Sequence, residues 1–246
     1  KNLEAVTLSK TIEIIEVEAF KGCESLTTFE IPESVEYIGG AVFASSGMTR
    51  FTLPERFTEV PYGMFENCQN LTEVILHDGV VSIGGSAFSS CMNLKNVDLP
   101  ASLEVIQNDA FAFSGLQGKE VEIDGTKMVA FQIPASVQRI EYNVFAECYD
   151  LKAIQMLSPV PCSADPWGFP KHTLIFVPKG CYQNYKNAWG YECNWADKNV
   201  YVRNNTTWEE TVMTLNDDGI AYLRQVLCLP EDAVPSTLKQ TTNVQA

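Results

Sequence analysis

Residues 19–38 read AFKGCESLTTFEIPESVEYI, and close variants of this stretch recur along the chain. Its phenylalanine returns at intervals of 22 to 24 residues, with a single longer interval of 34. A unit of this length that repeats in tandem predicts a solenoid, because one unit cannot bury its apolar face alone but stacked units can. The recurring residues are Phe20, Phe43, Phe65, Phe88, Phe111, Phe145 and Phe169.

Each unit carries a Leu-x-x-Phe/Val-x-Ile/Leu kernel that predicts a β-strand. In the quoted stretch Phe29 and Ile31 point inward while Thr28 and Glu30 point outward, as a period of two requires. Pro32 ends the strand because it has no N–H to donate. We therefore expect a right-handed repeat solenoid with about eight parallel strands on its concave face. The Val-x-x-Ile pair after each strand predicts a short turn or a bent extended segment on the far side. The phenylalanine is predicted to enter the core from a helical or 3₁₀ turn.

A column of small residues lies three positions after the phenylalanines. Its members are Cys23, Ser46, Cys68, Cys91, Ser114 and Cys148. The exchange of cysteine for serine favours a packing position under a turn, with a Cys68–Cys91 disulfide as the alternative because adjacent coils bring equivalent Cα atoms to about 5 Å. Outside this column lie Cys162, Cys181, Cys193 and Cys228, among which one disulfide would suit a secreted protein.

The long interval between Phe111 and Phe145 contains an insertion. Residues 119–131 form two alternating runs joined by Asp124-Gly125. Such a pattern predicts a β-hairpin that extends one strand and projects from a rim of the solenoid.

The repeats stop near the C-terminal end. Residues 1–202 are expected to form the solenoid, closed over 178–202 by a helix that starts near Gly180 and buries Tyr185 and Trp189 on one face. Residues 203–246 match no repeat; they predict a short helix near 220–228 and a poorly ordered tail. The first unit places Leu3 in a core position, so we expect the chain to be part of a longer protein.

Composition excludes several classes of function. The 31 acidic and 17 basic residues give a net charge of −14, which disfavours nucleic acid and anionic lipid as partners. No apolar run approaches the roughly 20 residues that span a bilayer. The chain lacks the nucleophile, metalloprotease and phosphate-loop motifs of enzymes, so we expect no catalytic activity and no cofactor.

The histidines and remaining cysteines give no metal site. Cys162, His172, Cys181 and Cys193 lack the closely spaced pairs of structural zinc sites. His77 replaces the proline found after other strands, which favours an exposed position on the rim.

The unit from Ala19 to Ile38 closely resembles the BspA-like leucine-rich repeat, and residues 176–186 resemble the usual closing segment of that family. The resemblance covers about residues 1–202. Members of the family are typical of secreted and surface proteins of Bacteroides-type bacteria and of some mucosal protists. They are generally described as adhesins or binders of host proteins. The resemblance therefore implies a location at the cell surface and a binding role, without a defined ligand.

The outward face of the strand ladder is the predicted binding surface, because curved solenoids bind along this face. Its candidate residues are Thr28, Glu30, Arg50, Thr52, Glu73, Ile75, Asn96, Asp98, Gln132, Gln155, Leu174 and Phe176. Leu174 and Phe176 are apolar, and either contact with a ligand or cover by the hairpin or the tail would account for them. We expect a monomer that is secreted or anchored to the outer surface and binds a host or neighbouring-cell protein. The alternatives are glycan binding, with Trp167, Trp189 and Trp195 as candidates, and a structural spacer within a larger surface protein.

Overall fold

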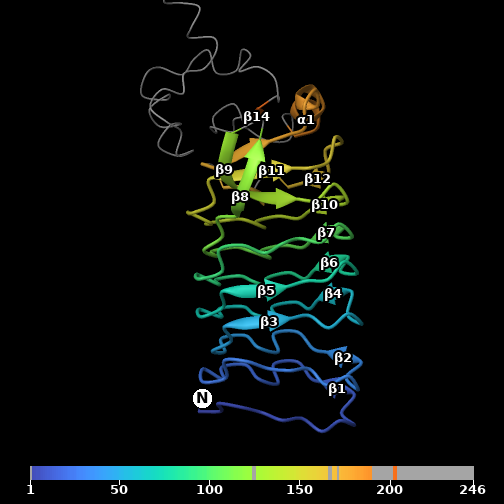
Figure 1. Ribbon diagram of the computed structural model, residues 1–246, viewed down its shortest axis with the longest axis vertical. Coiled ribbons are helices and arrows are strands. Elements are labelled where there is room, and N and C mark those ends of the chain that lie inside the picture. Colours follow the sequence, from blue (N-terminus) through green and yellow to red (C-terminus); the bar gives the residue numbers. More distant parts are fainter. Residues whose placement is uncertain (1, 124–125, 166–167, 171, 190–201, 204–246) are drawn as a thin grey trace, which may run out of the picture.

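The computed structural model describes residues 2–123, 126–165, 168–170, 172–189 and 202–203. They form a β-solenoid whose coils stack in a column, which is straight in the view of Figure 1. Two ladders of parallel strands run along the column. The predicted repeat solenoid is confirmed.

The first ladder contains the kernel strands. β3 (Arg50–Thr52) pairs with β5 (Glu73–Ile75), and a separate sheet has the order β14-β13-β11-β9-β8. The bounds in that sheet are Lys119–Ile123 for β8, Thr126–Ile133 for β9, Ala153–Met156 for β11, Leu174–Phe176 for β13 and Val202–Arg203 for β14. Two predicted strand positions, at 28–30 and 96–98, are not regular strands.

The Val-x-x-Ile segments form the second ladder. They were expected to be short turns or bent extended segments. They contribute two-residue strands that pair in parallel between adjacent coils, except that Tyr37–Ile38 does not pair with Glu59–Val60 in the next coil. Within the described residues these strands are β1 (Ile14–Ile15), β2 (Tyr37–Ile38), β4 (Glu59–Val60), β6 (Ser82–Ile83), β7 (Val105–Ile106), β10 (Arg139–Ile140) and β12 (Ser163–Ala164). The pairing satisfies backbone groups that each coil would otherwise leave unpaired.

The phenylalanine column forms the centre of the core. Phe65, Phe88 and Phe111 are fully buried, with ring centroids 5.8 Å and 5.3 Å apart and nearly parallel planes. The segment that carries the phenylalanine is a run of consecutive turns and not a helix. The residues two positions before and two positions after the phenylalanine have positive φ, as Ala41 and Ser45 do around Phe43. This backbone sends alternate N–H groups to the next coil, as from Phe43 to Met64 O at 3.0 Å.

The cysteine column lies beneath these turns and supplies hydrogen bonds. The thiols of Cys68 and Cys91 donate to the carbonyls of Phe43 and Phe65 in the preceding coil, at 3.0 and 3.1 Å. Cys148 donates in the same way to Phe111 at 3.0 Å. All the cysteines of the described chain are free, so the alternative of a Cys68–Cys91 disulfide is wrong.

The predicted hairpin is present. β8 and β9 pair antiparallel from Lys119↔Ala130 to Ile123↔Thr126. The second half of β9 continues as a ladder strand and pairs in parallel with β11. The hairpin therefore extends one coil of the ladder, as the alternating pattern indicated.

Helix α1 (Tyr182–Trp189) closes the C-terminal end of the core. Tyr185 and Trp189, four residues apart, are both buried; their donors reach the carbonyls of Ser158 and Cys162 at 2.9 and 2.8 Å. The ring of Trp189 lies 5.4 Å from that of Phe169, the last of the stack. The helix predicted near 220–228 and the predicted tail lie outside the described residues, and the boundary at 202 stays a prediction.

Candidate functional site

The strand face consists of the outward positions of the first ladder. In β3 and β5 the middle residues, Phe51 and Val74, are buried while both flanking residues are exposed. Parallel register sets Arg50 beside Glu73 and Thr52 beside Ile75. Alternation within each strand thus produces two outward columns, as predicted.

Charges on this face are partly paired. The Arg50 guanidinium donates to Glu73 Oε2 at 2.8 Å, with both side chains exposed. Such a pair contributes about 0–1 kcal/mol to stability, so it does little for folding. Its effect is to make this part of an acidic protein locally neutral.

Polar groups of the strand face are also paired at the base of the hairpin. Lys119 Nζ donates to Asp98 Oδ1 at 2.8 Å, and Asn96 donates to the same oxygen at 2.9 Å. The hydrogen bond from Lys119 is the main cause that lowers the pKa of Asp98, with Asn96 adding to it. Gln132 and Gln155 continue the face and join through an amide hydrogen bond of 2.9 Å.

The structure places the predicted residues in three groups. Exposed side chains belong to Thr28, Glu30, Arg50, Thr52, Glu73, Ile75 and Asp98, and half-buried ones to Asn96, Gln132 and Gln155. Leu174 and Phe176 are only 3% exposed. Of the two alternatives for these residues, contact with a ligand or cover, their burial supports cover.

Leu174 and Phe176 are covered by the hairpin. They point away from the main core and form a separate apolar cluster with Ile123, Met128 and residues of the same outward columns. Burying such side chains stabilises by about 1.5–3 kcal/mol each, which keeps the hairpin on this part of the face. The C-terminal half of the strand face is therefore closed, and the half from Thr28 to Asp98 is the open one.

The base of the hairpin is fixed by contacts that sequence reasoning did not find. The N–H groups of Gln117 and Gly118 both donate to Lys95 O, at 2.8 and 2.9 Å. Gly118 has φ +99, and a Cβ there would lie 2.2 Å from the backbone of Ala130, so only glycine fits. The one available signal was this glycine directly before the alternating run.

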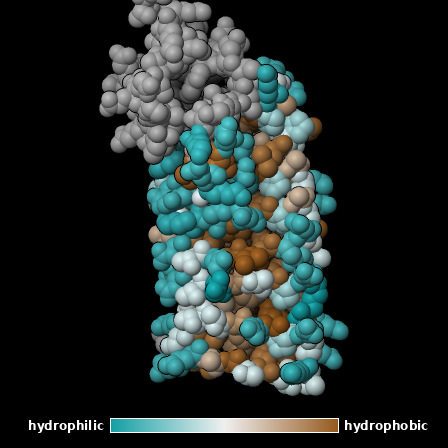
Figure 2. All heavy atoms as spheres, viewed as in Figure 1, coloured by the Kyte–Doolittle hydropathy of each residue, from teal (hydrophilic) through white to brown (hydrophobic). Residues whose placement is uncertain are grey.

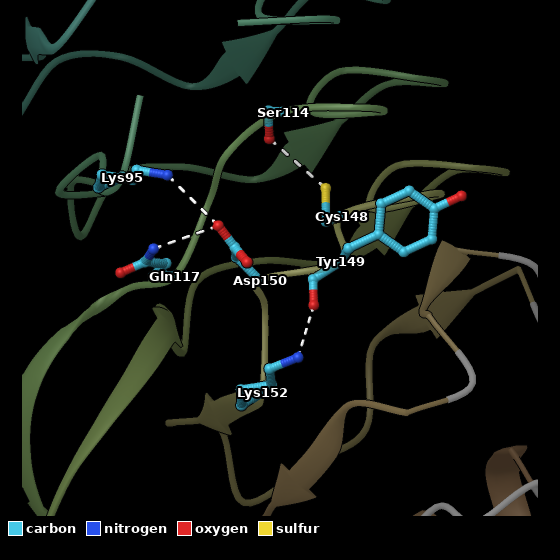
Figure 3. Close-up of polar contacts among 7 residues, drawn as sticks. All are labelled: Lys95, Ser114, Gln117, Cys148, Tyr149, Asp150 and Lys152. Atoms are coloured by element: carbon cyan, nitrogen blue, oxygen red, sulfur yellow. Dashed lines mark hydrogen bonds and ion pairs between the residues drawn. The ribbon is translucent and has the colours of Figure 1, made fainter. Parts of the chain in front are cut away.

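A second set of polar contacts joins the base of the hairpin to the next coil. Figure 3 shows Lys95 and Gln117 converging on the carboxylate of Asp150, each at 3.3 Å. The Gln117 hydrogen bond is the first cause that lowers the pKa of Asp150.

The open half of the strand face is mixed in character. Ile75 is 48% exposed beside the Arg50–Glu73 pair. Figure 2 shows a band of hydrophobic residues along the column on the side that carries β3 and β5, with hydrophilic residues on both flanks. An apolar centre with a polar rim is the usual composition of a protein–protein contact.

No metal-binding arrangement accompanies this face in the described residues. Nothing among them groups three or more His, Cys, Asp or Glu side chains as a metal site would. Burial raises the pKa of the Cys148 thiol to about 11 and that of Cys162 to about 12, so both are protonated and unreactive at neutral pH.

His77 is half-buried rather than an exposed rim residue. Its Nε2 lies 2.9 Å from Phe57 O, and its Nδ1 accepts from the Gly79 N–H at 3.0 Å. These contacts assign the proton to Nε2 and give the imidazole the place of the proline found in other units. The rim interpretation is wrong because the ring hydrogen-bonds the neighbouring coil.

The tryptophans give no exposed platform for a glycan in the described chain. Trp189 is buried in the closing helix. Trp167 and Trp195 lie outside the described residues.

No helix in the described part of the chain is long and apolar enough to cross a membrane.

Comparison with solved structures finds leucine-rich-repeat proteins. One from Bacteroides ovatus is 19% identical with a TM-score of 0.50, over 71% of this chain and 51% of that one. A leucine rich cell surface protein from Faecalibacterium prausnitzii is 25% identical with a TM-score of 0.41, over 69% and 48%. A leucine-rich-repeat protein from T. pallidum is 21% identical with a TM-score of 0.46, over 75% and 79%. The chain thus spans about half the length of the first two, and the first supports the fold alone.

Comparison with family models gives two matches. Residues 195–242 match the Plectin/S10 domain, in a region that lies almost wholly outside the described residues. Six copies of the BspA type leucine rich repeat region match residues 1–117 and 123–162, which is more than half of the chain. The chain therefore belongs to the BspA-type leucine-rich-repeat family.

Proposed function

We propose that the protein is a non-enzymatic interaction module that binds another protein through the open half of the strand face, from Thr28 to Asp98. The observation that carries the proposal is the contrast between two parts of one face. The hairpin buries Leu174 and Phe176, while Ile75 stays 48% exposed at the centre of the open half. Solenoids of this class bind along such surfaces.

The open half has the dimensions and chemistry of a contact for a folded partner or an extended segment. Its four coils, spaced at about 4.8 Å, present a face roughly 15–20 Å long. Ile75 supplies an apolar centre, and the Arg50–Glu73 pair and Asp98 supply polar groups around it. Partners of the adhesin type, on a host or neighbouring cell, fit the location that the family implies, which is secreted or anchored at the outer surface.

The test is a substitution at the centre of the face. Ile75→Asp should weaken binding to immobilised matrix proteins or to host cells by about tenfold or more, because it places a new charge in the apolar centre of the contact. Val160→Asp is the matched control, since Val160, like Ile75, has an exposed β-branched apolar side chain but lies outside the strand face. Circular dichroism should show both variants folded.

A second variant replaces Glu30, Arg50, Glu73 and Asp98 together with alanine. Loss of adhesion in this variant and in Ile75→Asp, with the Val160 variant unaffected, is the expected result. Adhesion equal to wild type in both would reject the strand face as the binding surface. Binding on a glycan array that survives in both would favour a glycan module, and no binding to any partner would favour a spacer.

A further inference from the structure

A second exposed apolar surface lies on the other ladder, at its N-terminal end. We call it the N-terminal edge; it comprises Ile14, Val17, Tyr37 and Tyr62, which are 51%, 57%, 51% and 59% exposed. Figure 1 shows β1, β2 and β4 stacked along one side of the column, away from β3 and β5. The N-terminal edge is thus separate from the strand face.

The residues of the N-terminal edge occupy consecutive coils. Ile14 and Tyr37 are direct partners in the parallel register of β1 and β2. The ring of Tyr62 lies against Gly40 on one side and Gly85 on the other, since a Cβ added to them would be 3.8 Å and 3.3 Å from its Cδ1 and Cδ2. Glycines in both neighbouring coils leave the space that the ring occupies.

The fold does not require large side chains at these positions. In the following coils Glu59, Ser82 and Val105 stand in turn where β2 has Tyr37, and Gly85 and then Asn108 stand where Tyr62 does. Ser82 is buried and Val105 half-buried, so neither forms an exposed apolar surface. Because the repeat accepts small or polar residues there, packing does not explain the exposed tyrosines.

Carboxylates surround the N-terminal edge. Glu13, Glu16, Glu36 and Glu59 are all exposed, and none forms an ion pair within the described residues. Arg56, a basic residue of the same coils, donates instead to the carbonyls of Val35 and Pro32. The surface thus combines open aromatic rings with uncompensated negative charge.

We propose that the N-terminal edge docks a basic segment of a partner protein, in which Arg or Lys side chains alternate with apolar ones. Guanidinium and ammonium groups bind the faces of tyrosine rings and pair with carboxylates, and guanidinium does both best. Ile14 and Val17 supply the contact for the apolar residues of such a segment. This surface is additional to the strand face of the proposed function and does not depend on it.

The test uses a fluorescein-labelled peptide of alternating Arg and Leu, with a second peptide in which Ser replaces Arg. Binding is measured by fluorescence polarisation at about 150 mM salt, because salt at this concentration screens unspecific attraction to an acidic protein. We expect the Arg peptide to bind and the Ser peptide not to bind. Tyr37→Ala with Tyr62→Ala should weaken binding by about tenfold or more, and Glu36→Gln with Glu59→Gln should weaken it and flatten its salt dependence.

The matched control is Tyr142→Ala with Tyr149→Ala. These tyrosines are exposed to a similar degree, and their removal leaves the net charge unchanged. Equal affinity of the Arg peptide for wild type and both tyrosine variants would overturn the proposal, because only net charge would then act. The proposal also fails if the Tyr37 and Tyr62 pair is needed for binding on a glycan array but not for peptide binding. Retained peptide binding by Ile75→Asp distinguishes this surface from the strand face.

Discussion

At the scale of single residues, the cysteine column shows how a packing position also carries hydrogen bonds. Each buried thiol donates to the carbonyl of a phenylalanine in the preceding coil, as Cys91 does to Phe65. Burial is the first cause that raises the pKa of Cys91 well above its usual value, so the thiol keeps its proton. A serine hydroxyl is also a small donor, which explains why the column accepts Ser46 and Ser114.

We therefore expect Cys91→Ala to destabilise the protein by about 1–2 kcal/mol, through the lost hydrogen bond and a small cavity. Cys91→Ser keeps a donor and should cost less. Urea unfolding followed by circular dichroism measures both. An alanine variant as stable as wild type, or a serine variant less stable than the alanine one, would show that the donor does not matter.

The buried imidazole of His172 leads to a prediction of how stability depends on pH. Its Nε2 is buried without a hydrogen-bond partner, and burial, followed by the charge of Lys152, lowers its pKa from 6.5. The unfolded chain therefore takes up the proton first as the pH falls. Stability should decrease as the pH drops from about 7 through the lowered pKa, because the unfolded state binds more protons in that window.

Thermal unfolding of wild type and His172→Phe between about pH 7 and pH 5 checks this sign. The wild-type melting temperature should fall more steeply than that of the variant. Parallel profiles would mean that groups other than His172 set the pH dependence in this range.

At the scale of elements, the hairpin was predictable, whereas its cover of Leu174 and Phe176 was one of several alternatives that the sequence left open. Two alternating runs around Asp124-Gly125 predict the hairpin from the sequence alone. That Leu174 and Phe176 point outward also followed from alternation. Their cover depends on the backbone path at Gly118 and on side chains from coils far apart in sequence, which no local pattern encodes.

Ile123→Asp should release the hairpin from the strand face, because it places a charge in the cluster around Phe176. Hydrogen exchange should rise in β8 and the first half of β9, with the solenoid coils from Phe43 to Phe111 unaffected. The matched control is Val129→Asp, since Val129 is half exposed on the same hairpin. Equal protection in both variants would mean that the apolar cluster does not hold the hairpin.

At the scale of the whole molecule, the phenylalanine interval was enough to predict the stack, because every coil contributes one ring. The pairing of the Val-x-x-Ile segments into a second ladder was not predicted, since two residues per coil are too few to show the alternation of a strand. Which outward side chains stay exposed could not be derived from the sequence either, because the exposure of Ile75 or Tyr62 depends on what neighbouring coils cover.

In a solenoid each coil contacts only its neighbours. The stability lost when a core side chain is removed should therefore depend on the position of that side chain along the column. Phe88 is fully buried between the rings of Phe65 and Phe111, whereas Phe20 is half-buried and stacks on Phe43 from one side. Phe88→Ala should therefore cost about 3–5 kcal/mol and Phe20→Ala clearly less. Equilibrium unfolding measures the difference, and hydrogen exchange should show the Phe20 variant opening only the first coils. Phe88→Leu, which preserves most of the volume, should fall between wild type and Phe88→Ala. Equal costs at the two positions would mean that the column unfolds as one cooperative unit and that the end coil is as strongly held as the middle.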